Sequence, residues 1–149
     1  MSFHIKQATI NDLPLIIDLF DEYRIFYKKP SDKAGAKKFL FQRFQHGESI
    51  IFLAKENEIA VGFTQLYPIF SSVSMQRVWL LNDLFVITSQ RKKGIAEQLM
   101  NAAKDFAILT EAKGIELSTA IDNAAAQNLY ERLGYKKDDS YMHYFLSLS

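Results

Sequence analysis

A short basic turn, Arg91-Lys-Lys-Gly94-Ile-Ala96, has the residue types of an anion-binding site. It follows an apolar run and opens a helical pattern, so it lies where a strand ends and a helix begins. Gly94 and Ala96 allow a ligand to approach the main chain closely. The helix that follows presents N–H groups without intrahelical partners and the positive end of its dipole. These features suit a phosphate or pyrophosphate, and Arg91, Lys92 and Lys93 would add positive potential. The alternative is an ordinary helix start with small packing residues and solvated basic side chains.

Two polar residues, Asn82 and Asp83, interrupt an apolar run at residues 75–87. A carboxylate inside an apolar strand costs on the order of several kcal/mol unless it is partnered or open to solvent. Asp83 could therefore accept a proton at a site, or it could pair with a buried backbone group or an arginine. Since neighbouring strand residues point to opposite faces, only one of the two need face a cleft.

The elements that must position these residues follow from hydrophobic periodicity. Helical spacing of apolar residues predicts helices from Leu13 to Tyr27, between Asp32 and His46, over 94–113, and between Asn123 and Gly134. Strands are predicted at 3–8, 49–55, 59–67, 75–87, 115–120, 135–137 and 141–148. The run at 75–87 is apolar on both alternating faces, which is typical of a central strand.

This order predicts an α+β fold with a mixed sheet of about seven strands and helices on both faces. The strand–helix–strand connection after residue 87 predicts a parallel, right-handed crossover. Gly62 indicates close backbone approach or a bulge, and Pro68 predicts the end of strand pairing. Lys113-Gly114 has the residue types of a helix C-terminus.

Composition narrows the possible functions. The chain has 149 residues, 48% hydrophobic, with a net charge of +1, which fits one domain spanning 1–149. The absence of cysteine excludes disulfides, cysteine metal sites and a cysteine nucleophile. The three histidines show no metal-ligand spacing, and no basic stripe suggests nucleic-acid binding. No signal peptide or membrane-spanning run is evident, so we expect a cytoplasmic protein.

Two separated motifs resemble those of the GNAT acetyltransferase superfamily. That family has a strand ending in Val, a short connection, then Q/R-x-x-G-x-G/A and a helix; this chain has Val86, residues 87–90, then Arg91-Lys-Lys-Gly94-Ile-Ala96. The family's second motif, N-x-x-A-x-x-L-Y, matches Asn123-Ala-Ala-Ala126-Gln-Asn-Leu129-Tyr130. The start Gln7-Ala8-Thr9-x-x-Asp12 is also similar, so the resemblance covers essentially the whole chain.

The resemblance implies a binding site for acetyl-CoA as cosubstrate, with no metal. The central strand and its neighbour would splay apart. The pantetheine arm would pair with Leu84, Phe85 and Val86, and the N–H of Leu84 would stabilise the oxyanion of the thioester. Asn123 would help to hold the pantetheine. The pyrophosphate would lie on the N–H groups of Lys92, Lys93, Gly94, Ile95 and Ala96.

Tyr130 matches the family's usual general acid, although its spacing alone favours a core aromatic. A phenol with a pKa near about 10 is a competent proton donor to a leaving thiolate. The amine must lose a proton before attack, and Asp83, directly or through water, is the first candidate base. The family's acceptor site usually involves the first two helices. Here residues 21–30 offer acids and aromatics such as Tyr27, which suit a cationic amine. The aromatics could instead belong to the core or to a cleft wall. Asn82 would add a polar group to the acceptor site.

The sequence therefore predicts direct acetyl transfer to a primary amine, favouring a small molecule over a protein lysine or N-terminus. The alternative of another class is a non-catalytic acyl-CoA-binding sensor or regulatory module. A homodimer is also expected from the resemblance, with the aromatic tail at 141–146 contributing.

Overall fold

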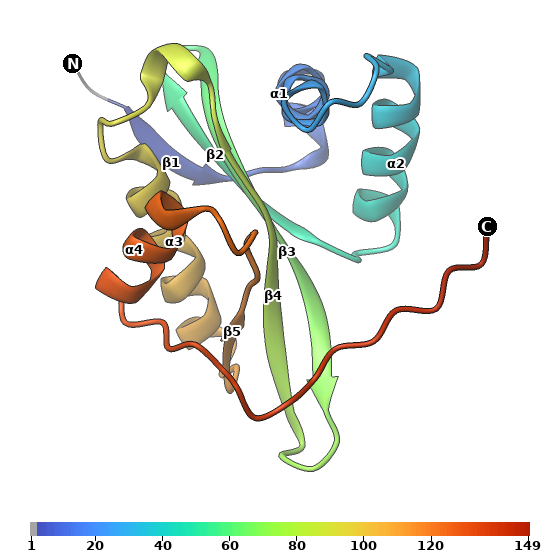
Figure 1. The fold of residues 1–149 in the computed structure, drawn as a ribbon. Coiled ribbons are helices and arrows are strands. Elements are labelled where there is room, and N and C mark those ends of the chain that lie inside the picture. The colour runs from blue at the N-terminus through green and yellow to red at the C-terminus, as the bar shows by residue number, and fades with distance from the viewer. Residues whose placement is uncertain (1–2) are drawn as a thin grey trace. The chain divides into compact units, whose positions relative to one another are not determined.

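The computed structural model describes residues 3–149, which form two compact units, Met1–Leu117 and Ser118–Ser149. Figure 1 traces the chain through both units, and each is described here by itself.

The first unit is a five-stranded sheet in the order β1-β2-β3-β4-β5 with three α-helices. Its strands are β1 His4–Gln7, β2 Ile50–Glu56, β3 Ile59–Ser71, β4 Gln76–Val86 and β5 Gly114–Glu116. Its helices are α1 Leu13–Phe26, α2 Lys33–Gln45 and α3 Ile95–Leu109, with short 3₁₀ turns η1 Ile10–Asp12 and η2 Thr88–Gln90. Strands β1 to β4 pair antiparallel and β5 joins β4 in parallel, so the predicted mixed sheet and parallel crossover are confirmed.

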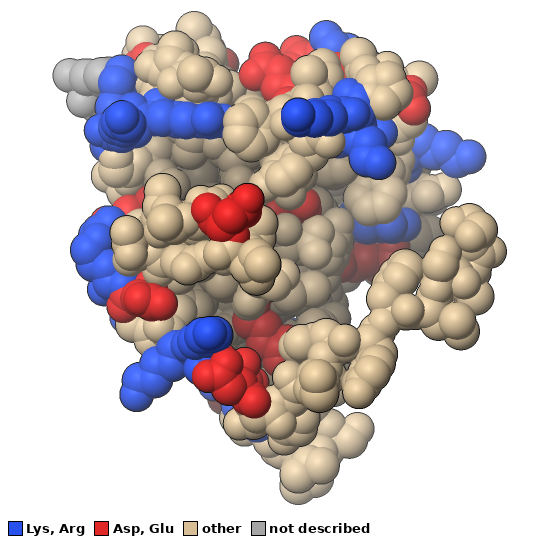
Figure 2. Space-filling view, in the orientation of Figure 1, with Lys and Arg blue, Asp and Glu red and all other residues tan. Residues whose placement is uncertain are grey.

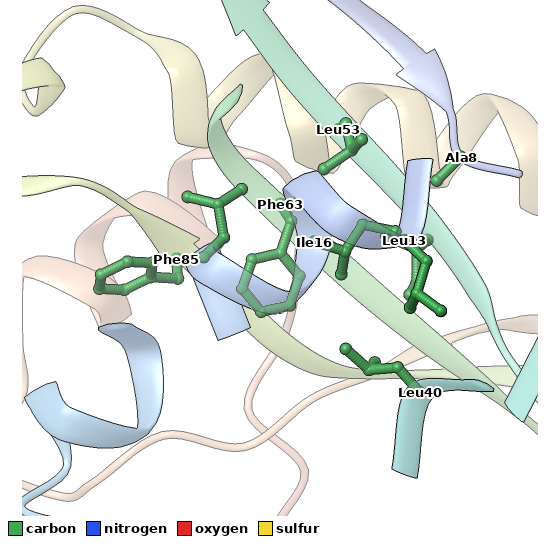
Figure 3. Close-up of a cluster of buried hydrophobic side chains, with 9 residues drawn as sticks. Ala8, Leu13, Ile16, Leu40, Leu53, Phe63 and Phe85 are labelled. Carbon is green, nitrogen blue, oxygen red and sulfur yellow. The ribbon is translucent and has the colours of Figure 1, made fainter. Parts of the chain in front are cut away.

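Helices cover both faces of this sheet, as predicted (Figure 1). On one face, Ile16 and Leu19 of α1 pack with Phe63 of β3 and Phe85 of β4 in one buried cluster. Figure 3 shows how the side chains of this cluster converge from α1 and the strands. On the other face, the ring of Phe106 from α3 lies 5.8 Å from that of Phe52. Alternation along the strands therefore supplies apolar side chains to both helix layers.

Strand β4 differs between its two halves. Strand β5 pairs only with Val78, Trp79 and Leu80, while β3 pairs with β4 from Gln76 to Val86. Gln65 pairs with Asp83 and Leu66 with Leu81, so Asn82 is the extra residue of a β-bulge. Beyond that bulge, β4 has a strand neighbour on one edge only, among the described residues. The bulge confirms the interruption expected at residues 82–83, and the open edge is the splayed region.

The second unit contains helix α4, Ala124–Arg132. Asn123 begins it, and its side-chain Oδ1 accepts a hydrogen bond from the N–H of Ala126 at 3.1 Å. No strand occurs in residues 118–149, so the strands predicted at 135–137 and 141–148 are wrong, and the sheet has five strands rather than seven. An alternating apolar segment becomes a strand only where a partner supplies hydrogen bonds, which its sequence alone does not specify.

Three predicted boundaries also change. Pairing continues past Pro68, which lies opposite Trp79, because β3 has run beyond the end of β2 and has one neighbour there; proline is tolerated at such an edge position. Helix α3 ends at Leu109, and Gly114 begins β5 instead of stopping the helix. Strand β5 ends at Glu116, although apolar and branched residues continue to Ala120.

Candidate active site

The turn between β4 and α3 places Gly94 at the N-cap of α3 in the left-handed conformation, with φ of 82°. A Cβ at this position would meet no atom within 4 Å, so the space beside the glycine is open. Gly94 has no side chain to cap the helix, and the N–H groups of Ile95 and Ala96 lie in its first turn, where no intrahelical partner is available. This arrangement fits an anion such as a pyrophosphate.

The basic side chains of the turn have different roles. The Nε of Arg91 donates a 2.8 Å hydrogen bond to the carbonyl of Val86, and its guanidinium lies over the rings of Phe26 and Phe85 at 4.8 and 5.6 Å. Lys93 donates from Nζ to Gln90 at 2.9 Å, while Lys92 is exposed with φ of 63°. Arg91 thus fastens the end of β4 to α1, and Lys92 leaves its charge in the solvent.

The backbone of residues 84–86 presents polar groups to the open edge of β4. The carbonyl of Phe85 faces β3, since it lies 2.9 Å from the position of a Cβ on Gly62, and the N–H of Ile87 donates to Val61 at 2.9 Å. Backbone groups alternate in direction along a strand, so those of Leu84 and Val86 point to the opposite edge. Strand β5 ends its pairing at Leu80, and an extended ligand could pair with the backbone of Leu84 and the N–H of Val86 as a strand would, while the Val86 carbonyl accepts from Arg91.

Asp83 lies at the bulge with its carboxylate held on the α1 side of the sheet. Only 6% of the residue is exposed. Its Oδ2 accepts a 2.8 Å hydrogen bond from Nε2 of Gln65, and its Oδ1 accepts one of 3.2 Å from Nδ2 of Asn82. No ion pair of Asp83 is found within residues 3–149. The carboxylate is thus buried among neutral hydrogen-bond donors, without the cation that usually accompanies a buried charge.

Two tyrosines lie close to this carboxylate. Burial raises the pKa of Tyr23 above its ordinary value, and the negative charge of Asp83 and a hydrogen bond to it raise the pKa further. The pKa of Tyr67 is raised first by burial and then by the charge of Asp83, with Arg43 acting in the opposite direction. Both phenols therefore stay protonated and available as hydrogen-bond donors.

An aromatic wall continues from Tyr23 to Tyr27. The ring of Tyr23 meets Phe63 edge-on at 5.6 Å and lies 5.7 Å from Phe85. Tyr27, at the end of α1, packs against Tyr23 at 5.2 Å and is 60% exposed. Tyr23 is thus partly buried against the core, and Tyr27 lies at the surface beside it; the choice between a structural role and binding of a cationic amine stays open for both.

The predicted residues fall into two groups. Residues 82–86 and 91–96 lie on consecutive elements of the first unit, whereas Asn123 and Tyr130 belong to the second. In that unit Asn123 caps α4, and the ring of Tyr130 lies 6.1 Å from that of Tyr135. Gln65 and Tyr67 were not anticipated from sequence. A polar residue within the apolar strand at 59–67 was a signal for Gln65, but only the register places it opposite Asp83.

Two further searches of the described part of the chain gave no candidate. No helix in it is long and apolar enough to cross a membrane. No group of three or more histidine, aspartate or glutamate side chains in residues 3–149 could hold a metal ion.

Several proteins similar to this chain are described as acetyltransferases. The family model described as "Acetyltransferase (GNAT) family" matches residues 16–135, which run through both units. An uncharacterised N-acetyltransferase, YhfO, of Bacillus subtilis is 47% identical over 97% of both chains. A probable acetyltransferase of Haemophilus influenzae is 34% identical over 93% of each. The crystal structure of a probable acetyltransferase, 41% identical, superposes with a TM-score of 0.92 over 98% of both chains.

The matched segment contains the Gly94 turn, the bulged strand and the Asn123 helix start, and the relatives align over nearly the whole chain. The chain therefore belongs to the GNAT acetyltransferase family and is an acetyl-CoA-dependent N-acetyltransferase.

Proposed function

We propose that this enzyme transfers the acetyl group of acetyl-CoA directly to the primary amine of a small molecule, with Asp83 as the proton acceptor. The observation that carries the proposal is the buried Asp83 carboxylate, which accepts hydrogen bonds from neutral side chains and lies next to the open edge of β4. A primary amine is protonated at neutral pH and has no lone pair for attack until a base removes the proton.

The chain's backbone would hold acetyl-CoA. The open-edge groups of Leu84 and Val86 support strand-like pairing with the pantetheine, with Phe85 between them. The N–H of Leu84 would donate to the thioester oxygen as negative charge develops there. The N–H groups of residues 92–96 would hold the pyrophosphate, with Lys92 and Lys93 adding positive charge. The Arg91 side chain already binds Val86, so it would contribute its backbone and the shape of the turn.

Proton transfers complete the reaction. As the amine nitrogen bonds to the acetyl carbon, the carbon–sulfur bond breaks, Asp83 takes a proton from nitrogen, and Tyr130 gives one to the leaving thiolate. Asn123 would assist in holding the pantetheine. The support for Asn123 and Tyr130 is their match to the family motif.

A small acceptor is favoured by two kinds of support. An L-2,4-diaminobutyric acid acetyltransferase of Marinococcus halophilus is 27% identical over 88% of this chain and 74% of its own. On the face drawn in Figure 2, acidic and basic side chains both occur, and the net charge of +1 gives no excess of acid to attract a basic protein tail. Tyr27 and Asn82, both exposed, would contact the acceptor beside Asp83.

A homodimer is a further part of the proposal. Its support is the tail, where Tyr141, Tyr144 and Phe145 are exposed. A mass measurement in solution that gives a monomer at micromolar concentration removes it.

The deciding experiment is an acetyl-CoA assay against diamino acids, polyamines, aminoglycosides and lysine-containing peptides, with free thiol as the readout. The chain has no cysteine, so every thiol detected comes from coenzyme A. We expect release with at least one small amine. Release with peptides alone would move the acceptor to protein, and release with no amine would favour the non-catalytic binding module.

The role of Tyr130 is tested by Tyr130→Phe, which keeps the ring and removes the hydroxyl. We expect kcat to fall by about 10²-fold while acetyl-CoA affinity stays the same, because a general acid acts in the chemical step. Unchanged turnover would show that another group protonates the thiolate.

A further inference from the structure

The side-chain oxygen of Gln65 is an acceptor without a donor. Gln65 is fully buried, and its Nε2 is used in the hydrogen bond to Asp83. Its Oε1 has no hydrogen-bond partner, and it is the only oxygen among the buried side-chain atoms left unpaired in residues 3–149. A buried polar atom of this kind requires an explanation, since leaving it unpaired costs about 1–3 kcal/mol.

The unpaired oxygen lies close to an uncompensated negative charge. The two atoms of the Gln65 amide group are about 2.3 Å apart and Nε2 is 2.8 Å from Oδ2 of Asp83, so Oε1 is within about 5 Å of the carboxylate. The N–H bonds of an ammonium group lie at about the tetrahedral angle, so one nitrogen can bond two oxygens that are about 4.5–5 Å apart. The spacing of the two oxygens and the charge of the carboxylate therefore match a single ammonium group.

We propose that Gln65 is a specificity-determining residue of the acceptor site: its Oε1 accepts one N–H of the substrate ammonium while Asp83 accepts another. This inference rests on the proposed amine acetyltransferase function. Gln65 also positions Asp83, because its Nε2 fixes Oδ2.

The Gln65–Asp83 pair favours a primary ammonium over other ligands. A neutral water could fill the acceptor but would leave the carboxylate without a counter-charge. A primary ammonium has three N–H donors, so it can bond both oxygens and retain one, whereas a secondary ammonium has only two. Tyr23 and Tyr67, both near Asp83, enclose this charge in a low-dielectric wall.

The direct test is a ¹H–¹⁵N spectrum of the wild-type side-chain amides during titration, with the Gln65 signal assigned by its loss in Gln65→Met. We expect a saturable shift of this signal with n-butylammonium chloride and none with tetramethylammonium chloride, which has the same charge but no N–H. Equal shifts with both salts, or none with either, would overturn the proposal, and a site filled only by water gives the second result.

Kinetics give a second, independent readout. For an accepted primary amine, we expect Gln65→Met to lower kcat/KM by about 10- to 100-fold, and the preference for that amine over its N-methyl derivative to fall at least about tenfold. The matched control is Thr64→Val, which also changes a fully buried polar residue of β3; Thr64 donates from Oγ1 to the Asp83 carbonyl at 2.7 Å, not to its carboxylate. In Thr64→Val, the preference for the primary amine over its N-methyl derivative should equal that of the wild type. An equal loss for both amines in Gln65→Met would reduce Gln65 to a structural residue and overturn the specificity role.

The two proposals fail in different ways. A Gln65 signal that responds to n-butylammonium, with no turnover of any amine, would contradict acetyl transfer and leave the ammonium site standing. Turnover of a primary amine with no response at Gln65 would leave the function standing and remove the ammonium site.

Discussion

Two aspartates of the first unit are buried to a similar degree, yet their surroundings differ. Asp21 of α1, 2% exposed, accepts a 2.7 Å hydrogen bond from the hydroxyl of Ser31 and one of 2.8 Å from the N–H of Asp32. These hydrogen bonds, led by that of Ser31, hold the pKa of Asp21 below its ordinary value. The carboxylate thereby ties α1 to the start of α2.

Asp83, 6% exposed, is bound by the side chains of Gln65, Asn82 and Tyr23, not by a loop backbone. Next to it lie an unpaired acceptor on Gln65 and the open edge of β4. Burial alone thus does not separate a structural carboxylate from a functional one. The difference lies in which polar groups the surroundings leave unpaired. The carboxylate of Asp21 is bound by the Ser31 hydroxyl and the Asp32 N–H. Near Asp83, the Gln65 oxygen has no hydrogen-bond donor and the carboxylate has no ion-pair partner among residues 3–149.

The largest effect is expected for Asp83→Asn. An amide of the same shape cannot take the proton from the amine, so kcat should fall by about 10²- to 10⁴-fold. Acetyl-CoA affinity, measured by calorimetric titration, should stay within about twofold, because the cosubstrate is proposed to bind the backbone of 84–86 and 92–96.

Asp21→Asn is the matched control, since it makes the same substitution at an equally buried position. It should keep kcat within about twofold. If the two variants lost activity equally, the contrast between the two aspartates would be wrong, and Asp83 would be a second structural carboxylate.

A smaller effect, on acetyl-CoA affinity, is expected to distinguish two glycines with similar backbone conformations. Gly94 and Gly47 both have positive φ, of 82° and 60°, and a Cβ on either would meet no atom within 4 Å. Valine at such a position costs about 1–2 kcal/mol of backbone strain. Gly94→Val should weaken acetyl-CoA binding about tenfold or more, because the side chain occupies the approach to the α3 N-terminus.

Gly47→Val carries a similar strain at the end of α2, away from the proposed site, so it should lower stability without changing acetyl-CoA affinity. Equal affinities in wild type and Gly94→Val would exclude the turn as the pyrophosphate site. If both variants lost acetyl-CoA affinity equally, the loss would be a consequence of lower stability and not of a blocked binding site.

The sequence was sufficient for elements that depend on local pattern. The helix starts at Asp32 and Asn123 and the interruption at Asn82 are local features, and each is present as predicted. Pairing is different, because it depends on a distant partner. Neither the lack of strands after residue 117 nor the position of Gln65 opposite Asp83 could be read from either segment alone.

The smallest effect concerns the pH dependence of stability at Asp21. Because its folded pKa is lowered, its hydrogen bonds stabilise the fold fully above the ordinary value of about 3.8, and this contribution is lost as the pH falls through the lowered pKa. Asp21→Asn should therefore melt about 3 °C below wild type at pH 7, with the difference shrinking towards pH 3.

Asp105→Asn, at an exposed position of α3, provides the baseline for losing one negative charge. A melting difference for Asp21→Asn that stayed constant from pH 7 to pH 3 would mean that shape, not charge, stabilises the α1–α2 connection. Asp21 would then hold the connection by its shape, whereas the proposed role of Asp83 as a proton acceptor still requires a carboxylate.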